Sequence, residues 1–328
     1  MGEKIRRILK NSGCDFVVIN RESSLKYLTN AGFATETAYL ISDNKKKVLF
    51  VTVLDGSYKT VETKKYKSIS DIKKWIKENM RGVAGFDVGT YDGYLTVKKI
   101  LAGQKKKDIR HEVDSLSAVK TEEEIKKIKK ATKVTKNAID FGMSNFKKNM
   151  TEKNLASMIK SYITSKNMDY SFCTAQGDKN SAIPHHLPDS TKIKRIVVVD
   201  VGATCDGYSS DISRTFLINP TKEMKKVYKI VEDAQKKSID AVEQGVTAKA
   251  VDKAGRDHIL SNNYEFIHST GHGVGLIDHG HPKISPRSAE TLKQRMVFTI
   301  EPGIYLPNKF GVRIEDVFVV RKNKAQML

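Results

Sequence analysis

Four carboxylates in this chain occur as two pairs, and each pair lies symmetrically about a turn signal. Asp200 and Asp211 flank a turn whose midpoint falls between Cys205 and Asp206, while Glu301 and Glu315 are centred on Asn308. If both segments are β-hairpins, the two acids of each pair face one another, with Cβ atoms about 4.5–5.5 Å apart. Four acids held so close stay ionised only when a positive charge lies among them, and a metal ion is the simplest choice.

The surroundings of Asp200 strengthen this interpretation. Asp200 interrupts the apolar run Ile196–Val201, so a buried and unpaired charge would be costly there. A salt bridge inside the core, with Arg195 or Arg214, would also explain a single such aspartate. The same arrangement recurs at Glu301, which follows another apolar run, and this repetition favours metal over a lone salt bridge.

The composition predicts a soluble protein that is too long for one average domain. The chain has 328 residues, of which 39% are hydrophobic and 29% charged. It contains no apolar run of membrane-spanning length, and its first residues do not resemble a secretory signal. The three cysteines, Cys14, Cys173 and Cys205, are too few and too irregularly spaced for a disulfide framework. We therefore expect a cytoplasmic location and no membrane association.

The net charge of +20 raises the question of nucleic-acid binding. The basic residues are scattered in short runs among acidic ones, without a basic tail or an aromatic-basic repeat. A solvated, lysine-rich surface explains this pattern better, so we expect no specific nucleic-acid partner.

The hydrophobic pattern predicts two domains, residues 1–113 and residues 114–328. The first has an α/β pattern, with strands and helices listed in order as Phe16–Ile19, Ala38–Ile41, Val48–Val51, Ile69–Met80 and Gly93–Leu101. The boundary is marked by a capping box, in which Thr121 begins a helix and Glu124 follows three residues later. This helix carries an apolar stripe formed by Ile125, Ile128, Ala131, Val134, Ala138 and Phe141.

The second domain is expected to have two similar halves. Helices near 121–141 and 151–163 precede strand-rich segments at 170–184 and 194–217, and helices near 221–243 and 247–261 precede strand-rich segments at 264–283 and 295–321. This order is a pseudo-repeat of architecture, and each half contributes one carboxylate pair. The fold class that follows is α+β.

One histidine stands out as a candidate ligand. His272 lies between Gly271 and Gly273, which allow the backbone to approach closely and leave the imidazole accessible. His186 and His281 more plausibly serve at the surface or in hydrogen bonds. Four carboxylates and one imidazole suit two divalent cations, such as Mn, Co, Fe(II) or Zn, and lack the thiolates of a structural zinc site. Two such ions hold a bridging hydroxide and polarise a carbonyl, which is the chemistry of a hydrolase.

Five motifs carry a resemblance to a known family. They are Asp200–Ala203, Gly207–Phe216, Gly271–Leu276, Ile300–Tyr305 and Gly311–Asp316. In this order they closely resemble the pita-bread metallopeptidases, also called creatinase/aminopeptidase-like, which include prolidase (Xaa-Pro dipeptidase), Xaa-Pro aminopeptidase and methionine aminopeptidase. The resemblance implies a C-terminal pita-bread catalytic domain with a pseudo-twofold repeat. The segment Arg21–Asn30 resembles the creatinase N-terminal domain, which methionine aminopeptidases typically lack.

The resemblance also assigns roles to residues. It implies five metal ligands, with Asp211 and Glu315 bridging two ions, Asp200 on one of them, and His272 and Glu301 on the other. Glu301 would also shuttle a proton. His185 and His279 would be catalytic residues beside the scissile group, and three residues would shape the substrate pocket, namely His268, Tyr305 and Arg313.

The resemblance leaves the branch of the family open. It implies hydrolysis of Xaa-Pro bonds by a homodimer that holds two divalent metal ions per subunit, with Mn or Co preferred and Fe or Zn as alternatives. The compact length favours a dipeptidase, and an aminopeptidase acting on longer peptides is the alternative. A binding protein that has lost the chemistry is disfavoured, because all five ligand positions are intact. The chain departs from the family at Gly280–Pro282, where an acid usually follows the second histidine, and in a shorter loop from His185 to Asp200.

Overall fold

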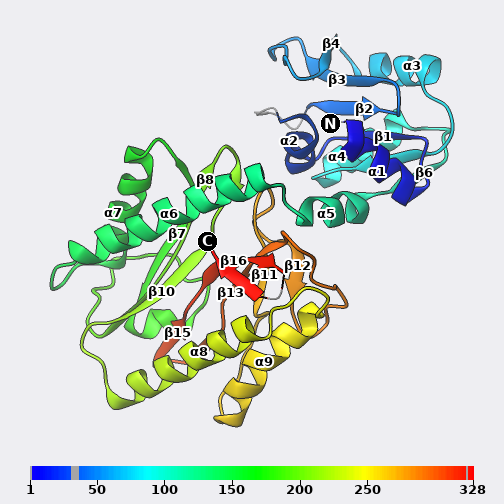
Figure 1. Ribbon diagram of the computed structural model, residues 1–328. Coiled ribbons are helices and arrows are strands. Elements are labelled where there is room, and N and C mark those ends of the chain that lie inside the picture. Colours follow the sequence, from blue (N-terminus) through cyan, green and yellow to red (C-terminus); the bar gives the residue numbers. More distant parts are fainter. Residues whose placement is uncertain (1, 31–36, 323) are drawn as a thin grey trace. The chain divides into compact units, whose positions relative to one another are not determined.

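The chain divides into two compact units, Met1–Ser117 and Ala118–Leu328. The computed structural model describes residues 2–30, 37–322 and 324–328, and Figure 1 shows the helices and strands in sequence colours. Within these described residues, no helix is both long enough and apolar enough to cross a bilayer.

The first unit is built on a six-stranded sheet in the order β4-β3-β2-β1-β5-β6. The strands are β1 Phe16–Ile19, β2 Tyr39–Ser42, β3 Lys47–Thr52, β4 Glu62–Tyr66, β5 Ala84–Asp87 and β6 Lys106–Asp108. The helices are α1 Gly2–Ser12, α2 Glu22–Thr29, α3 Ile69–Asn79, α4 Tyr91–Ile100 and α5 Arg110–Ala118. The three strands and two helices predicted for this unit are confirmed within two residues at each end.

A buried ion-pair network ties the start of α2 to the sheet of this unit. Arg21 Nη2 lies 2.9 Å from Asp87 Oδ2 and 2.6 Å from Asp114 Oδ1. Ser24 Oγ donates to the same oxygen of Asp87 at 2.6 Å. Arg21 thus compensates both acids, and Asp87 Oδ1, which has no hydrogen-bond partner among the described residues, lies 3.9 Å from Arg110 Nε.

The second unit contains two helix pairs and the strands that follow each pair. Its helices are α6 Glu122–Ser144, α7 Glu152–Ser165, α8 Lys222–Asp240 and α9 Ala248–Ser261, with one 3-10 turn, η1 Asp178–Ala182. The strands of the first half are β7 Asp169–Gly177, β8 Ile196–Cys205, β9 Tyr208–Ser209 and β10 Ile212–Leu217. Those of the second half are β11 Gly271–Gly273, β12 Gly280–Ile284, β13 Val297–Ile300, β14 Gly303–Leu306, β15 Phe310–Arg313, β16 Asp316–Arg321 and β17 Lys324–Met327. The predicted repeat of two helices followed by hairpins is confirmed.

Each helix pair packs against the strands of its own half (Figure 1). Helices α6 and α7 lie along β7 and β8, while α8 and α9 pack together and contact the β12–β15 region. The first half of the core joins the apolar face of α6 to valines of β8, and the second joins α8 to β14 and β15. The first of these clusters also includes Val297, Val317 and Val319 of the second half, so strands of both halves share it.

The start of α6 forms as the sequence predicts. Thr121 Oγ1 accepts from the backbone N–H of Glu124, and Glu124 Oε2 accepts from the N–H of Thr121 at 2.7 Å. The predicted apolar stripe is buried along most of its length, with Ile128 fully buried. Phe141 is the exception, because it is 41% exposed and packs on the ring of Tyr162 at the helix surface.

Candidate metal centre

The first carboxylate pair lies on β8 and just before β10, with a register that differs from the predicted one. Asp200 is the Cα partner of Ser213, not of Asp211. The expected facing of Asp200 and Asp211 was therefore wrong. The hairpin turns at Asp206 and Gly207, with Cys205 paired to Tyr208, so its centre lies one residue further along than the midpoint of the two acids. Asp211 is consequently a diagonal neighbour of Asp200 on the same face of the sheet.

The second pair keeps the predicted register. Gly303 pairs with Arg313 on one side of Glu301 and Glu315, and Ile300 pairs with Asp316 on the other. The two acids thus occupy equivalent positions where both strands break, and the three-residue loop has Asn308 at its centre with φ of 63°. Both breaks release the strands from ladder pairing at the positions of the acids.

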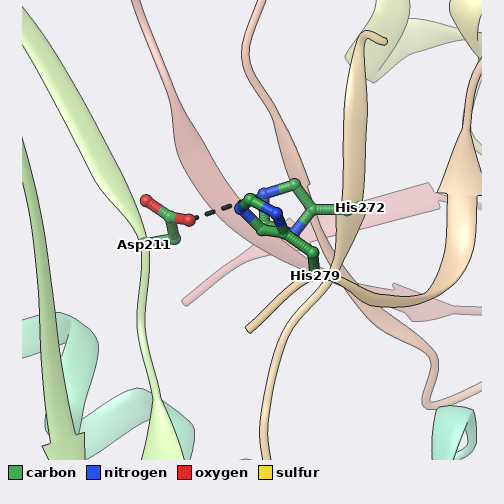
Figure 2. A group of neighbouring side chains, drawn as sticks. All are labelled: Asp211, His272 and His279. Atoms are coloured by element: carbon green, nitrogen blue, oxygen red, sulfur yellow. Dashed lines mark ion pairs between the residues drawn. The ribbon is translucent and has the colours of Figure 1, made fainter. Parts of the chain in front are cut away.

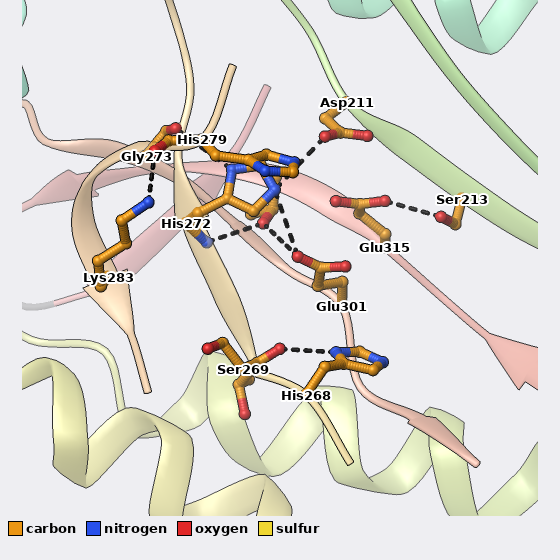
Figure 3. Close-up of polar contacts among 12 residues, drawn as sticks. Asp211, Ser213, His268, Ser269, His272, Gly273, His279, Lys283, Glu301 and Glu315 are labelled. Atoms are coloured by element: carbon orange, nitrogen blue, oxygen red, sulfur yellow. Dashed lines mark hydrogen bonds and ion pairs between the residues drawn. The ribbon is translucent and has the colours of Figure 1, made fainter. Parts of the chain in front are cut away.

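The five predicted ligands converge in overlapping groups, and Figure 3 shows Asp211, His272, Glu301 and Glu315 of this set. Potential ligand atoms lie within 4.8 Å of one another in the group Asp200, Asp211 and Glu315, and again in the group His272, Glu301 and Glu315. His272 Nε2 lies 3.3 Å from Glu301 Oε1 and 3.5 Å from Asp211 Oδ2. Glu315 therefore belongs to both groups. The short distance between His272, of the second group, and Asp211, of the first, is a further contact between them.

A third group adds a histidine to this cluster. Figure 2 shows Asp211 facing His272 and His279, and the three residues again offer ligand atoms within 4.8 Å. The two imidazole rings lie 4.2 Å apart between centroids. His279 is exposed whereas His272 is buried, so His279 lies at the open side of the cluster.

The glycines beside His272 are required by close backbone contacts. A Cβ atom at Gly271 would overlap the carbonyl oxygen of Thr299, and one at Gly273 would overlap that of His281. The predicted close approach of the backbone is therefore confirmed, and it brings β11 tightly against β13.

The carboxylates are held by a hydroxyl and an arginine. Ser213 Oγ lies 2.8 Å from Asp200 Oδ1 and 2.7 Å from Glu315 Oε2, and it accepts from Arg313 Nε at 2.7 Å. Arg313 Nη2 also lies 2.7 Å from Asp200 Oδ2. Because a hydroxyl has a single proton, Ser213 satisfies only one of the two carboxylates at a time. The partner of Asp200 is Arg313, and neither Arg195 nor Arg214 takes that place; Arg214 pairs with Asp316.

One carboxylate oxygen of the cluster, Glu315 Oε1, is buried and has no hydrogen-bond partner among the described residues. An unpartnered carboxylate oxygen in a buried site is costly, and a cation would relieve the cost. The donor set of four carboxylates and one imidazole fits hard to borderline divalent cations, so the residues present fit a metal centre.

The pKa shifts of the cluster residues also indicate that a positive charge is missing. Burial raises the pKa of Asp211 and of Glu315 well above the ordinary range, and the neighbouring carboxylates add to both shifts. Burial raises the pKa of Glu301 to about 7. Burial lowers the pKa of His272 to about 3, with a further contribution from His279. Without a cation, the site thus favours protonated carboxyl groups and a neutral imidazole, the form in which histidine binds metal.

The predicted substrate-pocket residues, His268, Tyr305 and Arg313, form a series of hydrogen bonds beside the cluster. Tyr305 OH lies 3.0 Å from His268 Nε2 and accepts from Arg313 Nη1 at 3.0 Å. Burial lowers the pKa of His268 to about 4, and the Arg313 and Arg256 cations contribute. Arg313, which is 4% exposed, ends this series on Asp200.

Comparison with known proteins identifies the second unit. The profile of metallopeptidase family M24 matches residues 126–322, and that of the creatinase/prolidase N-terminal domain matches residues 2–119. The M24 match covers more than half of the chain. The chain belongs to metallopeptidase family M24.

Full-length relatives of this M24 chain share both units. A Xaa-Pro dipeptidase of Pyrococcus furiosus is 31% identical over 99% of this chain and 96% of its own length. The structure of the prolidase from Pyrococcus horikoshii is 29% identical, with a TM-score of 0.91 over 99% of this chain and 97% of that one. The structure of X-Pro aminopeptidase from Thermotoga maritima is 27% identical, with a TM-score of 0.89 over 100% and 96%. The pita-bread fold expected from the sequence is confirmed.

The sequence analysis missed two polar side chains of the M24 site. Ser213 stands directly across from Asp200, and its position follows only from the true register of the hairpin. Gln235 of α8 donates through Nε2 to the carbonyls of Ile300 and Ile314 at 3.1 and 3.4 Å. These carbonyls directly precede Glu301 and Glu315, so one buried amide holds both strands at their breaks. Nothing local in the sequence indicates this contact.

Proposed function

We propose that the chain is a Xaa-Pro dipeptidase whose active site is the five-residue cluster. The observation that carries the proposal is the convergence of Asp200, Asp211, His272, Glu301 and Glu315 around a buried carboxylate oxygen that lacks a partner. The dipeptidase relatives that span nearly the whole chain support the choice of substrate. The chain itself is a metallopeptidase, as its family requires.

The cluster would hold two divalent cations. Glu315 belongs to two ligand groups and Asp211 to two, which supports bridging roles for both; Asp200 would serve one ion, and His272 with Glu301 the other. The preponderance of oxygen ligands with one imidazole favours Mn or Co, with Fe or Zn as alternatives. Such ions would polarise the scissile carbonyl and lower the pKa of a water molecule.

The surrounding residues would handle protons and the substrate. Glu301 would accept a proton from the attacking water and pass it to the proline nitrogen as that amine leaves. His279 is exposed at the open side of the cluster, and His185 is exposed on the loop that precedes β8. Both would donate to the oxyanion that develops on the scissile carbonyl. The chain of His268, Tyr305 and Arg313 would form the wall of the substrate pocket.

Three further features belong to the proposal. The catalytic domain would comprise residues 114–328 and the creatinase-like domain residues 1–113. The enzyme would act as a homodimer in the cytoplasm, where buried free cysteines such as Cys14, Cys173 and Cys205 stay reduced.

The test compares peptide length on the metal-loaded full chain. Hydrolysis of Xaa-Pro dipeptides, with Xaa-Pro-Xaa tripeptides of the same first residues cleaved at least about tenfold more slowly, supports a dipeptidase. Comparable cleavage of the tripeptides would move the assignment to an Xaa-Pro aminopeptidase, the activity that the Thermotoga maritima structure is named for. Cleavage of peptides without proline at equal rates would overturn both.

A further inference from the structure

The segment that presents His185 is fixed by side chains outside the metal cluster. This segment, residues 183–189, is here called the His185 segment. The N–H of His186 donates to the carbonyl of Ile183, forming a turn with His185 near its tip. Ile183 and Leu187 are 54% and 76% exposed, so apolar burial does not anchor these parts of the segment. Its position must come from polar contacts.

Gln176 provides the first of these contacts. Its amide Nε2 donates to the carbonyl oxygens of Pro184 at 2.9 Å and His186 at 3.2 Å. Both acceptors are carbonyls, so the facing atom is the amide nitrogen. These are the two carbonyls on either side of His185. Gln176 is fully buried on β7 and pairs with Val198, two residues before Asp200, so its side chain lies on the same sheet face as Asp200.

The amide oxygen of Gln176 indicates that this residue is not placed for stability alone. Gln176 Oε1 is buried and lacks a hydrogen-bond partner among the described residues. A buried amide that satisfies only its nitrogen carries a desolvation cost that a methionine of similar size would avoid. A residue retained at such a cost is a candidate for holding the His185 segment in one geometry.

Glu152 provides the second anchor, from the first turn of α7. Its Oε1 accepts from the N–H of Gly177 at 2.6 Å and from Asn180 Nδ2 at 3.0 Å. Its Oε2 lies 3.1 Å from His186 Nε2 and accepts from the N–H of Asp189 at 3.1 Å. All four partners belong to residues 177–189, so one fully buried carboxylate closes the loop that carries His185.

The same contacts argue against a second metal site here. Glu152, His186 and Asp189 offer ligand atoms within 4.8 Å of one another. Each oxygen of Glu152 already receives two N–H groups, and a carboxylate has about four acceptor positions. His186 Nε2 faces an acceptor-only group, so it carries the proton and donates. The acceptor positions of Glu152 are therefore filled by hydrogen bonds, which leaves this carboxylate no free position for a metal ion.

We propose that Gln176 and Glu152 act together as a clamp that positions His185 for its proposed contact with the scissile group. The proposal rests on the proposed function, in which His185 contacts the scissile group. The other face of the loop is also held, because Ser181 Oγ accepts from the N–H of Gly311 at 2.8 Å on β15, the strand of Arg313. The clamp residues touch no reacting atom and act through His185. A displacement of about 1 Å at such a group can lower the rate about 10²-fold.

The experiment is a double-mutant cycle on the full, Mn-loaded chain. Gln176→Met and Glu152→Gln are each combined with His185→Ala, and kcat is measured with an Xaa-Pro dipeptide, together with metal content. We expect each clamp variant alone to lower kcat at least about tenfold with metal content unchanged. In the His185→Ala background the same changes should alter kcat less than about twofold, because the residue they position is gone.

A matched control separates positioning from general loss of stability. Glu124 is also a buried glutamate in the first turn of a helix, and it binds Tyr208 OH at 2.9 Å, away from the His185 segment. Glu124→Gln should have the same effect on kcat with and without His185→Ala. If Gln176→Met or Glu152→Gln lowers kcat by the same factor with and without His185→Ala, the role of that residue is merely structural and the proposal is overturned.

Hydrogen exchange gives a readout that does not depend on catalysis. In both clamp variants the amides of residues 183–189 should exchange faster, while those of β8 and α6 keep their protection. Unchanged exchange in the His185 segment overturns the clamp, whatever the activity. A metal-loaded wild-type chain that cleaves no Xaa-Pro peptide overturns the proposed function instead, and the exchange result still decides whether Gln176 and Glu152 fix the segment.

Discussion

Asp211 has the least replaceable carboxylate of the cluster. It shares one ligand group with Asp200 and Glu315 and another with His272 and His279. Asp211 is buried, so solvent water does not compensate for the loss of its charge. Burial, and then the neighbouring Glu315, raise the pKa of Asp211. A neutral isostere at this position should therefore affect both ions of the proposed pair.

The change Asp211→Asn is expected to lower metal content to at most one ion per subunit and to abolish measurable hydrolysis, because a bridging charge is lost. Elemental analysis after dialysis measures the ions. The control is Asp87→Asn, which alters a buried aspartate of the first unit that pairs with Arg21. Two ions retained by the Asp211 variant would remove Asp211 from the ligand set.

Tyr305→Phe tests the chain from His268 to Arg313. The phenol joins these two side chains, and its loss removes two hydrogen bonds, each worth roughly 0.5–1.5 kcal/mol. We expect kcat/KM to fall about 5- to 100-fold with both metal ions retained. Tyr162→Phe, a change at a ring that packs on Phe141 of α6, should leave kcat/KM unaltered. Loss of metal in the Tyr305 variant would instead show that Tyr305 and Arg313 hold the metal ligands in place and do not shape the substrate pocket.

At the residue scale, local patterns were predicted well and long-range partners were not. The capping box at Thr121 involves residues three apart, so the sequence contains all of it. As the alternative to a metal at Asp200, the sequence suggested a salt bridge with Arg195 or Arg214, yet the arginine that pairs with Asp200 is Arg313, more than a hundred residues away in the chain. The contacts of Gln176 and Glu152 were not foreseen either. Gln176 bonds backbone carbonyls, and Glu152 joins backbone N–H groups to the side chains of Asn180 and His186, which no sequence pattern marks.

At the scale of elements, the two hairpins explain how the acids meet. The sequence placed the second turn correctly at Asn308, but it set the first turn one residue too early. Both Asp206 and Gly207 have positive φ, of 50° and 83°, which a two-residue turn of the hairpin type requires. The equal spacing of the acids was thus a sound guide to their proximity and a poor guide to their register, which the backbone of the turn decides.

Gly207→Ala tests this turn. A side chain at a φ of 83° is strained, so we expect the free energy of unfolding to fall by about 1 kcal/mol. The ladder between Asp200 and Ser213 is unchanged, and metal content should stay the same. Gly56→Ala serves as the control, since a Cβ there meets no atom within 4 Å and φ is not positive. Denaturant unfolding measures both, and an unaffected Gly207 variant would contradict the assigned turn.

At the scale of the whole molecule, metal binding and protons compete for the same buried site. The pKa values of Asp211, Glu315 and Glu301 are raised in the folded chain, Glu301 to about 7, so these three carboxyl groups bind more protons in the folded than in the unfolded state above about pH 4.5. The contribution of these groups to the stability of the metal-free chain is complete below about pH 4 and falls as pH rises through 7.

The difference in Tm between metal-loaded and metal-free protein should therefore grow between pH 5 and pH 8. Metal requires the ionised carboxylates, and it relieves the repulsion that destabilises them as pH rises. Calorimetry with and without a chelator measures the difference. In Asp211→Asn the growth with pH should be smaller, and a difference that shrinks with rising pH in the wild type would contradict a carboxylate metal centre.

The central claim, a two-metal centre that hydrolyses Xaa-Pro dipeptides, is tested most directly by titrating metal-free protein with Mn. Activity on an Xaa-Pro dipeptide and bound Mn are followed together, from zero to four equivalents per subunit. The proposal predicts no activity without metal and a plateau at about two bound ions, since the five proposed ligands form two overlapping groups. Full activity in the chelated protein, or a plateau with no bound Mn, would contradict the claim.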